Sequence, residues 1–211
     1  MVELILDVCI EYGFAARLGY LIIDNTTNND SMVKFLAQLI PSIDPAENRL
    51  HCLAHVINLA ARAFINGLGP AHDPGMDDND DATVPEPIVK VLFGIHYIRR
   101  SPLRRTQYRN AADDLELPDV TLVPNNKTRF NSVCKMIHSA LPQHLAIDQF
   151  MWEEQFEHPA GSMARKQLRK HLLTAEDWRE LEVLYRLLKP FKSCTLATEG
   201  MHSPLLQLTD L

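Results

Sequence analysis

The spacing of apolar side chains divides the first 67 residues into alternating helices and strands. Intervals of three and four predict an amphipathic helix over residues 2–17, with one apolar face formed by Leu4, Ile5, Val8, Cys9 and Tyr12. The continuous apolar run 20–23 predicts a short strand buried on both faces, and residues 32–39 return to helical spacing. A weaker strand at 49–52 and a third helix ending near Gly67 complete the order helix, strand, helix, strand, helix.

The pattern changes in the second half of the chain. Residues 68–87 contain Gly, Pro and Asp throughout and little apolar surface, which predicts a flexible acidic loop. Helical spacing dominates from residue 88 onward. The last helix is the clearest, because Thr174 and Asp177 resemble a capping box ahead of it, and Pro190 should kink or end it. The fold class is therefore α/β followed by a mainly α region, with a boundary at residue 87.

Composition excludes several classes of protein. No run approaches the roughly 20 apolar residues that a membrane-spanning helix needs. The N-terminus has no basic stretch ahead of an apolar one and does not resemble a secretory signal. The four cysteines are far apart and form no Cys-x-x-Cys pair, which is typical of reduced thiols. We therefore expect a soluble protein of the cytosol or nucleus without a membrane partner.

The distribution of charge is more informative than its sum. A net charge of −6 argues on average against nucleic acid as a partner. Acidic residues are crowded into 73–86, however, and a group of arginines follows directly: Arg99, Arg100, Arg104, Arg105 and Arg109. Guanidinium groups bind phosphates in bidentate geometry, so these arginines are candidates for DNA contact. The alternative is a solvated helical face that pairs with the acidic loop.

Two positions are candidates for chemistry. Asp24 ends the predicted strand 20–23, where functional side chains emerge from α/β sheets, although it could instead cap the next helix together with Asn25. Cys52 and His55 are three residues apart at a junction between strand and helix. They would supply half of a zinc site, but no second Cys/His pair follows at zinc-finger spacing. A buried thiol beside a hydrogen-bonded imidazole is the structural alternative.

Several segments resemble signatures of the hAT superfamily of cut-and-paste DNA transposases. Residues 23–30, Ile-Asp-Asn-Thr-Thr-Asn-Asn-Asp, are similar to the family's Asp-Asn-x-x-Asn-Asn motif. Residues 49–59, Arg-Leu-His-Cys-Leu-Ala-His-Val-Ile-Asn-Leu, resemble its Arg-x-x-Cys-x-x-His-x-x-Asn-Leu segment. Residues 97–102, 128–132 and 173–191 are similar to three further signatures in the expected order. The five matches span most of the chain.

The resemblance implies a partial RNase H-like domain over residues 1–67 and an all-helical insertion over residues 88–211, on either side of the acidic loop. In that family three carboxylates hold Mg²⁺ or Mn²⁺ for DNA strand cleavage and transfer. Asp24 corresponds to the middle acid and would be a metal ligand, and His55 would lie near the reaction centre. The first acid would precede residue 2, and Glu199 is too close to the last matched segment to be the third acid. We therefore expect two of the three acids to be lacking.

One pair of residues departs from the family pattern. After Arg129 the family has tryptophan, which is associated with stacking on distorted transposon-end DNA, whereas this chain has Phe130. Phenylalanine keeps a ring face for stacking but is smaller and has no indole N–H donor. Phe130 could instead be a core residue at the start of a helix that continues through Val133 and Ile137.

The resemblance leads to two hypotheses on function. The first is a fragment of a nuclear hAT-type transposase or of a protein derived from one, inactive alone, with transposon ends or non-specific duplex DNA as partner. Self-association through an uncovered sheet edge would accompany it. The second is a domesticated module that binds DNA or protein without catalysis. Whether this chain is an enzyme is left open by both.

Overall fold

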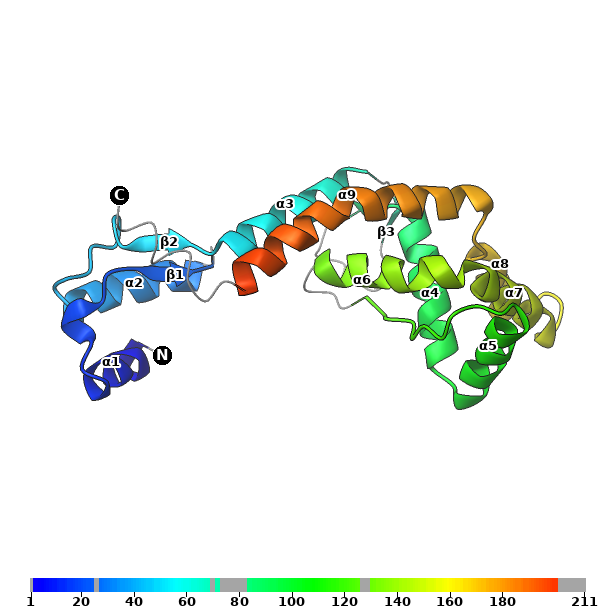
Figure 1. Cartoon of the computed structure of the whole chain (residues 1–211), viewed down its shortest axis with the longest axis horizontal. Helices are drawn as coiled ribbons and strands as arrows, with labels where there is room; N and C mark the ends of the chain where they lie inside the picture. Colours follow the sequence, from blue (N-terminus) through cyan, green and yellow to red (C-terminus); the bar gives the residue numbers. More distant parts are fainter. Residues whose placement is uncertain (1, 25–26, 69–70, 73–82, 126–129, 201–211) are drawn as a thin grey trace. The chain divides into compact units, whose positions relative to one another are not determined.

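The structure is a computed structural model that describes residues 2–24, 27–68, 71–72, 83–125 and 130–200 (Figure 1). By packing, the chain divides into two compact units, Met1–Leu59 with Ala197–Leu211 and Ala60–Leu196. We call them the N-terminal unit and the helical unit. The division falls inside the helix Leu53–Gly67 rather than at residue 87. None of the described helices is long and apolar enough to cross a membrane.

The N-terminal unit has the predicted order of elements. It contains helix α1 (Val2–Glu11), strand β1 (Leu21–Ile23), helix α2 (Thr27–Leu39), strand β2 (Arg49–His51) and the start of helix α3 (Leu53–Gly67). The first helix is shorter than the predicted 2–17. Gly13 adopts a φ of 68°, and the amides of Gly13 and Phe14 donate to the carbonyls of Ile10 and Cys9. These two bonds are a Schellman motif, which ends the helix, and a 3₁₀ turn at Ala15–Arg17 follows.

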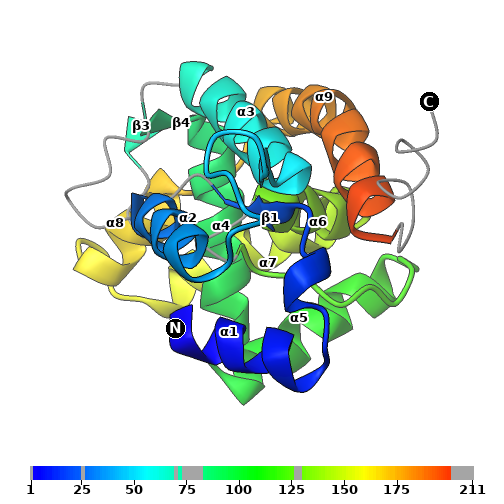
Figure 2. The same cartoon turned by 90° about the vertical axis from the view of Figure 1, so that its left-hand side faces the viewer.

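The two strands of the N-terminal unit pair in parallel, with Ile22 opposite Leu50. Helix α1 packs against α2 (Figures 1 and 2), and the buried cluster of the unit is formed by Val33, Leu36, Ile40 and Ile43. Leu21 and Ile23 pack on this cluster. Ile22 points to the opposite face, as alternation along a strand requires, and its side chain is 49% exposed. The prediction of a strand buried on both faces was therefore wrong.

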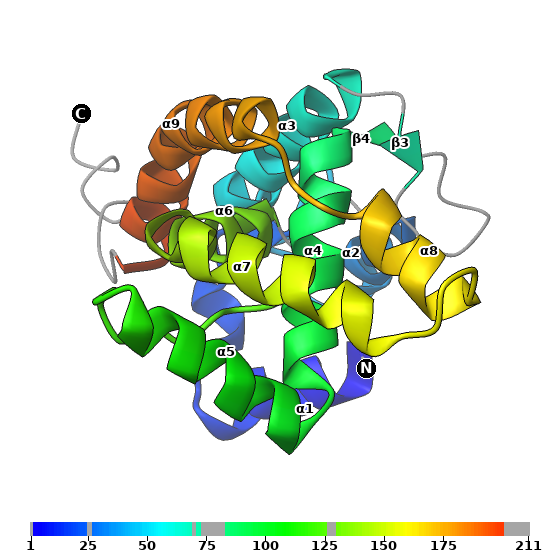
Figure 3. The same cartoon turned by 90° about the vertical axis from the view of Figure 1, so that its right-hand side faces the viewer.

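The helical unit confirms the mainly α prediction for the second half of the chain. Its helices are α4 (Glu86–Arg99), α5 (Pro102–Asp114), α6 (Phe130–Ala140), α7 (His144–Glu154) and α8 (Met163–Lys170), followed by α9 (Ala175–Gly200), which extends past the unit's limit at Leu196. Helix α4 buries eight of its 14 residues and packs against α5 and α6 (Figure 3). The chain breaks between α4 and α5 at Ser101-Pro102, where Ser101 is extended and α5 begins at the proline.

The acidic loop predicted over residues 68–87 has secondary structure at its ends. Strand β3 (Ala71–His72) pairs antiparallel with strand β4 (Thr83–Val84), and α4 begins already at Glu86. Residues 73–82, which carry most of the acidic side chains of this segment, lie outside the described residues. The description of 68–87 as a loop is thus corrected at both ends.

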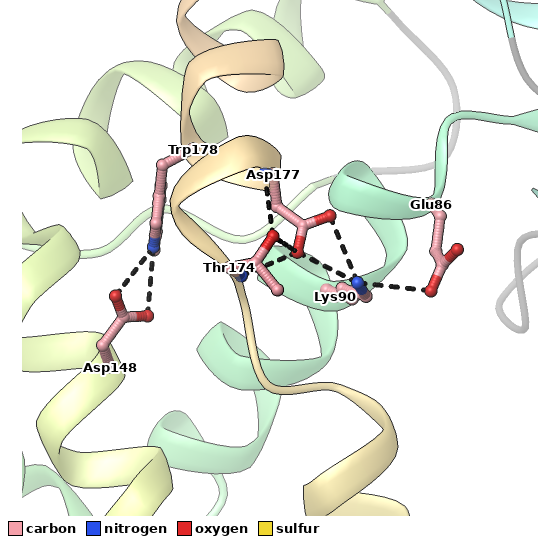
Figure 4. A network of polar contacts seen from close by, with 6 residues as sticks. All are labelled: Glu86, Lys90, Asp148, Thr174, Asp177 and Trp178. Atoms are coloured by element: carbon pink, nitrogen blue, oxygen red, sulfur yellow. Dashed lines mark hydrogen bonds and ion pairs between the residues drawn. The ribbon is translucent and has the colours of Figure 1, made fainter.

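The start of α9 confirms the predicted capping box (Figure 4). The Thr174 amide donates to Oδ2 of Asp177 at 2.7 Å, and the Asp177 amide donates to the Thr174 hydroxyl at 3.2 Å. The two residues therefore satisfy each other's backbone donors at the helix N-terminus. The same helix does not end at Pro190 but continues to Gly200.

Candidate acidic site and arginine surface

The topology of the N-terminal unit brings the two candidate chemical positions to one edge of the sheet. Asp24 directly follows β1. Because β2 is parallel to β1, its carboxyl end lies at the same edge, where the Cys52 amide donates to the Ile23 carbonyl at 2.9 Å. Helix α3 begins one residue later, so the half-buried His55 lies in its first turn. Segments that are separate signatures in the sequence are therefore neighbours in the fold.

Asp24 is held by a residue of the same motif. Its Oδ1 accepts a hydrogen bond from the Asn29 side-chain amide at 2.5 Å, and Asn29 lies in the first turn of α2. The carboxylate borders an open hollow of about 570 Å³, which is lined by Val2, Asp24, Asn28, Asn29, Ser31, Met32 and Phe35. Asn29 thus orients the candidate acid, a role that the sequence analysis did not assign to it.

An ion pair joins the two motif segments a second time. Arg49, the first residue of β2, pairs through its guanidinium with Asp30 of α2. Arg49 begins the second motif and Asp30 ends the first. The side chains are 19% and 43% exposed, so the pair is partly screened from water. It fixes α2 against β2 beside Asp24.

The described residues do not fit a two-metal centre. Two divalent cations about 4 Å apart require several oxygen ligands to offset their repulsion. Among the residues that the structure describes, no group of three or more His, Cys, Asp or Glu side chains could hold a metal ion. Asp24 therefore has no set of companion ligands there, and neither does a zinc site built on Cys52 and His55.

Arg104 has a structural partner that the sequence did not indicate. Its Nε donates to Oε1 of the buried Glu154 at 3.2 Å, and its guanidinium carbon lies 3.7 Å from the centre of the Tyr97 ring. The Tyr97 hydroxyl donates to the same oxygen of Glu154 at 3.0 Å. Burial and the Glu154 carboxylate raise the pKa of Tyr97 to about 12. Arg104 therefore links α4, α5 and α7 and balances a buried acid.

Three other arginines of the group line a small hollow on the surface of the helical unit. Arg99 donates from Nη1 to the Leu122 carbonyl at 2.8 Å. Arg99, Arg105 and Arg109 line a hollow of about 210 Å³ that they share with Asp113 and Asp119. Arg105 and Arg109 are exposed and four residues apart on α5, so they project to the same side of the helix.

Arg100, Arg105 and Arg109 together form what we call the arginine surface. Arg100 is exposed at the carboxyl end of α4 and directly follows Arg99, which lines the hollow. Arg99 and Arg104 are not included, because their guanidinium groups bind the Leu122 carbonyl and Glu154. The arginine surface is therefore smaller than the group of arginines in the sequence.

Phe130 is a core residue. Its side chain is 2% exposed, and its ring meets Phe191 edge-on with centroids 6.3 Å apart. Phe191 also stacks on Phe64. A base could stack on Phe130 only if the ring left this cluster, so its burial favours the structural alternative given above. Arg129, its predicted partner in DNA contact, lies outside the described residues.

Comparisons with known proteins show a similarity to part of a longer protein. No family model and no solved structure matches the chain. A protein of Talaromyces stipitatus named "Putative transcriptional regulator tpeD" is 26% identical over 206 residues. The match covers 90% of this chain and 22% of that protein. The chain is therefore similar to a segment of a much longer protein.

Proposed function

We propose that this chain is part of a hAT-type transposase or of a protein derived from one, and that it contacts DNA without cutting it alone. One observation carries the proposal. The parallel pairing of β1 and β2 brings Asp24 of the first motif to the same sheet edge as Cys52 and His55 of the second. The ion pair between Asp30 and Arg49 joins the same two segments. This proximity is what the proposal requires, because residues that serve one site have to lie together.

In this proposal the N-terminal unit is part of an RNase H-like domain, and the helical unit is the insertion. The parent chemistry is strand cleavage and transfer, with Mg²⁺ or Mn²⁺ as the cofactor of the intact parent. A single carboxylate holds a hydrated divalent ion only loosely, so this chain by itself is proposed to be inactive. Each strand also keeps an edge that no other described strand pairs, which supports self-association.

A second candidate is a derived module that binds DNA and has no catalytic role. The similar protein of Talaromyces stipitatus is named as a transcriptional regulator, and the described residues around Asp24 form no metal site. Both candidates predict DNA as a partner and the nucleus as the location. They differ in whether Asp24 has a chemical role.

The proposed DNA contact is electrostatic and uses the arginine surface. Phosphate contacts position a protein on the duplex without reading its sequence, so binding should be weak, should not depend on base sequence, and should fall as salt rises. Asp113 and Asp119 lie in the same hollow and reduce the local positive potential. We therefore expect binding to be measurable only at low ionic strength.

The test is a titration of labelled duplex DNA, followed by fluorescence anisotropy at two salt concentrations. The variant Arg105→Glu/Arg109→Glu should bind at least about tenfold more weakly than the parent, because it reverses two phosphate-facing charges. Arg179→Glu is the control, since Arg179 is an exposed arginine of α9 outside the arginine surface. Equal binding by parent and double variant would overturn the proposed contact.

The same mixtures with Mn²⁺ should show no nicking of the DNA. Nicking by the parent that the substitution Asp24→Asn abolishes would contradict the claim that this chain is inactive alone.

A further inference from the structure

Two large aromatic side chains are exposed where α7 ends. Trp152 lies on the last turn of α7 and is 57% exposed, and Phe156 lies on the 3₁₀ turn Gln155–Glu157 and is 54% exposed. Their ring centroids are 5.6 Å apart in an edge-to-face arrangement. Trp152 is therefore a ring exposed to solvent and supported from one side by Phe156. An exposed aromatic pair of this size marks an interaction site more often than a lone exposed leucine does.

A basic helix borders this pair. Helix α8 contacts the 3₁₀ turn and α7 and contains no acidic residue. Figure 3 shows α8 beside the end of α7. Four of its residues are cationic: Arg165, Lys166, Arg169 and Lys170. Leu168 is fully buried and anchors the helix, and the Arg165 guanidinium lies 4.8 Å from the centre of the Phe156 ring. Arg169 is one turn further along on the same side as Arg165.

The glutamates next to the aromatic pair in sequence point away from it. Glu153 and Glu157 line a separate hollow of about 220 Å³ together with Asp114 of α5. Glu154 is buried against Arg104. Glu153, Glu154 and Glu157 are thus directed toward α5. Asp148, the other acidic residue of α7, accepts from the Trp178 indole of α9, so positive charge remains beside the aromatic pair.

We propose that Trp152, Phe156, Arg165 and Arg169 form a binding surface for single-stranded DNA, which we call the stacking surface. An unpaired base has a free ring face that can stack on Trp152, while the phosphates on either side bind the two arginines. Bases within a duplex are already stacked on one another and offer only phosphates. An acidic peptide would use the arginines but would give the exposed indole no planar partner. The stacking surface does not depend on descent from a transposase and does not overlap the arginine surface.

The experiment measures binding of a labelled 12-nucleotide oligo(dT) to the full chain by fluorescence anisotropy, with the matching duplex in parallel. The single strand should bind more tightly than the duplex, and its affinity should fall as salt rises. Trp152→Ala should weaken single-strand binding about tenfold, whereas Trp152→Phe should keep most of it because a stacking face remains. Arg165→Gln/Arg169→Gln should weaken it by a similar factor.

Three controls separate this inference from the proposed function. Arg179→Gln removes an exposed charge elsewhere and should have no effect. Arg105→Glu/Arg109→Glu should weaken duplex binding and leave single-strand binding close to that of the parent. Oligo(dT) should also quench tryptophan fluorescence in the parent but not in Trp152→Phe, because the remaining Trp178 is only 8% exposed. Unchanged single-strand affinity in Trp152→Ala, or equal affinity for duplex and single strand, would overturn the stacking surface whatever the outcome for the arginine surface.

Discussion

The two units of the molecule use apolar residues in different ways. In the helical unit α4 is covered by its neighbours, so that Val91 and Ile95 are fully buried. In the N-terminal unit the apolar face of α1 includes Leu4 and Val8, yet Leu4 is 66% and Val8 41% exposed. Helical periodicity predicts that a helix has an apolar face. It does not predict whether another element of the fold packs on that face.

The difference has a consequence for local stability. The buried cluster of the N-terminal unit consists of Val33, Leu36, Ile40 and Ile43, with partly buried side chains around it. Segments with few buried apolar contacts open at a lower free energy than segments in a large core. We therefore expect the N-terminal unit to open first, and the Asp24 edge with it. The arginine surface and the stacking surface belong to the helical unit and should stay ordered when that happens.

The largest expected effect comes from Leu36→Ala, which removes a fully buried side chain from the small cluster. Leucine-to-alanine changes in cores cost about 2–5 kcal/mol, and few other contacts in this unit compensate. Hydrogen exchange followed by mass spectrometry should show loss of protection in α1, β1 and α2 while α4 and α7 stay protected.

The matched control is Ile22→Ala in the same unit, which should cost less than about 0.5 kcal/mol because Ile22 is half exposed. Simultaneous loss of protection in α4 and α7 in Leu36→Ala would show that the two units unfold together, and the contrast between them would then be wrong.

The order of elements was predictable from sequence because it depends on local spacing. The order of helices and strands through Gly67, the break at Ser101-Pro102 and the capping box at Thr174 all follow from residues within one or two turns. Exposure was less predictable. Alternation states that Ile22 and Ile23 face opposite sides, but only the number and placement of packed elements decides which of them is buried.

Site residues were harder to predict for the same reason. Arg104 and Arg105 are adjacent and chemically alike, yet Arg104 pairs with Glu154 fifty residues further along the chain and Arg105 does not share that partner. Trp152 and Phe156 are four apart, and this spacing is typical both of a buried helical face and of an exposed one. The exposure of both rings depends on where α8 packs, and the local sequence pattern does not predict that position.

A smaller effect is expected from Asp177→Ala, which tests how firmly α9 is held in the helical unit. Asp177 caps the helix and also accepts hydrogen bonds from Lys90 of α4 at 3.1 and 3.0 Å (Figure 4). Loss of the cap costs about 1 kcal/mol, and loss of the hydrogen bonds to the part-buried Lys90, which keeps only its ion pair with Glu86, adds up to about the same amount. Urea unfolding of the helical unit should show a decrease of roughly 2 kcal/mol in the free energy of unfolding.

The control is Glu176→Ala, at an exposed neighbouring position, which should change the free energy of unfolding little. A decrease no greater in Asp177→Ala than in Glu176→Ala would mean that this network does not hold α9.

The smallest expected effect is a change in pH dependence caused by Asp148→Asn. Burial raises the pKa of Asp148 from its ordinary value of 3.8 to about 6, although the Trp178 indole N–H, which donates to both of its oxygens at 3.0 and 2.9 Å, acts in the opposite direction. Because the folded-state pKa is raised, the contribution of this group to stability is fully present below about pH 4 and is lost as the pH rises through about 6.

Burial also acts on Asp177, but the Thr174 and Lys90 hydrogen bonds leave its pKa lowered, so its contribution is present above about pH 4 and is lost at lower pH. As the pH rises from about 4 through 6, therefore, Asp148 progressively loses its contribution to stability, whereas Asp177 keeps its own. Asparagine keeps an oxygen for the indole N–H and stays neutral, so the variant should match the parent near pH 4 and exceed it near pH 7. We expect a gain of about 1 kcal/mol, less than the full shift would give because the carboxylate is partly exposed. Thermal unfolding at the two pH values measures this, with Glu180→Gln, an exposed carboxylate of α9, as control. An equal difference between variant and parent at both pH values would mean that Asp148 does not change charge in this range.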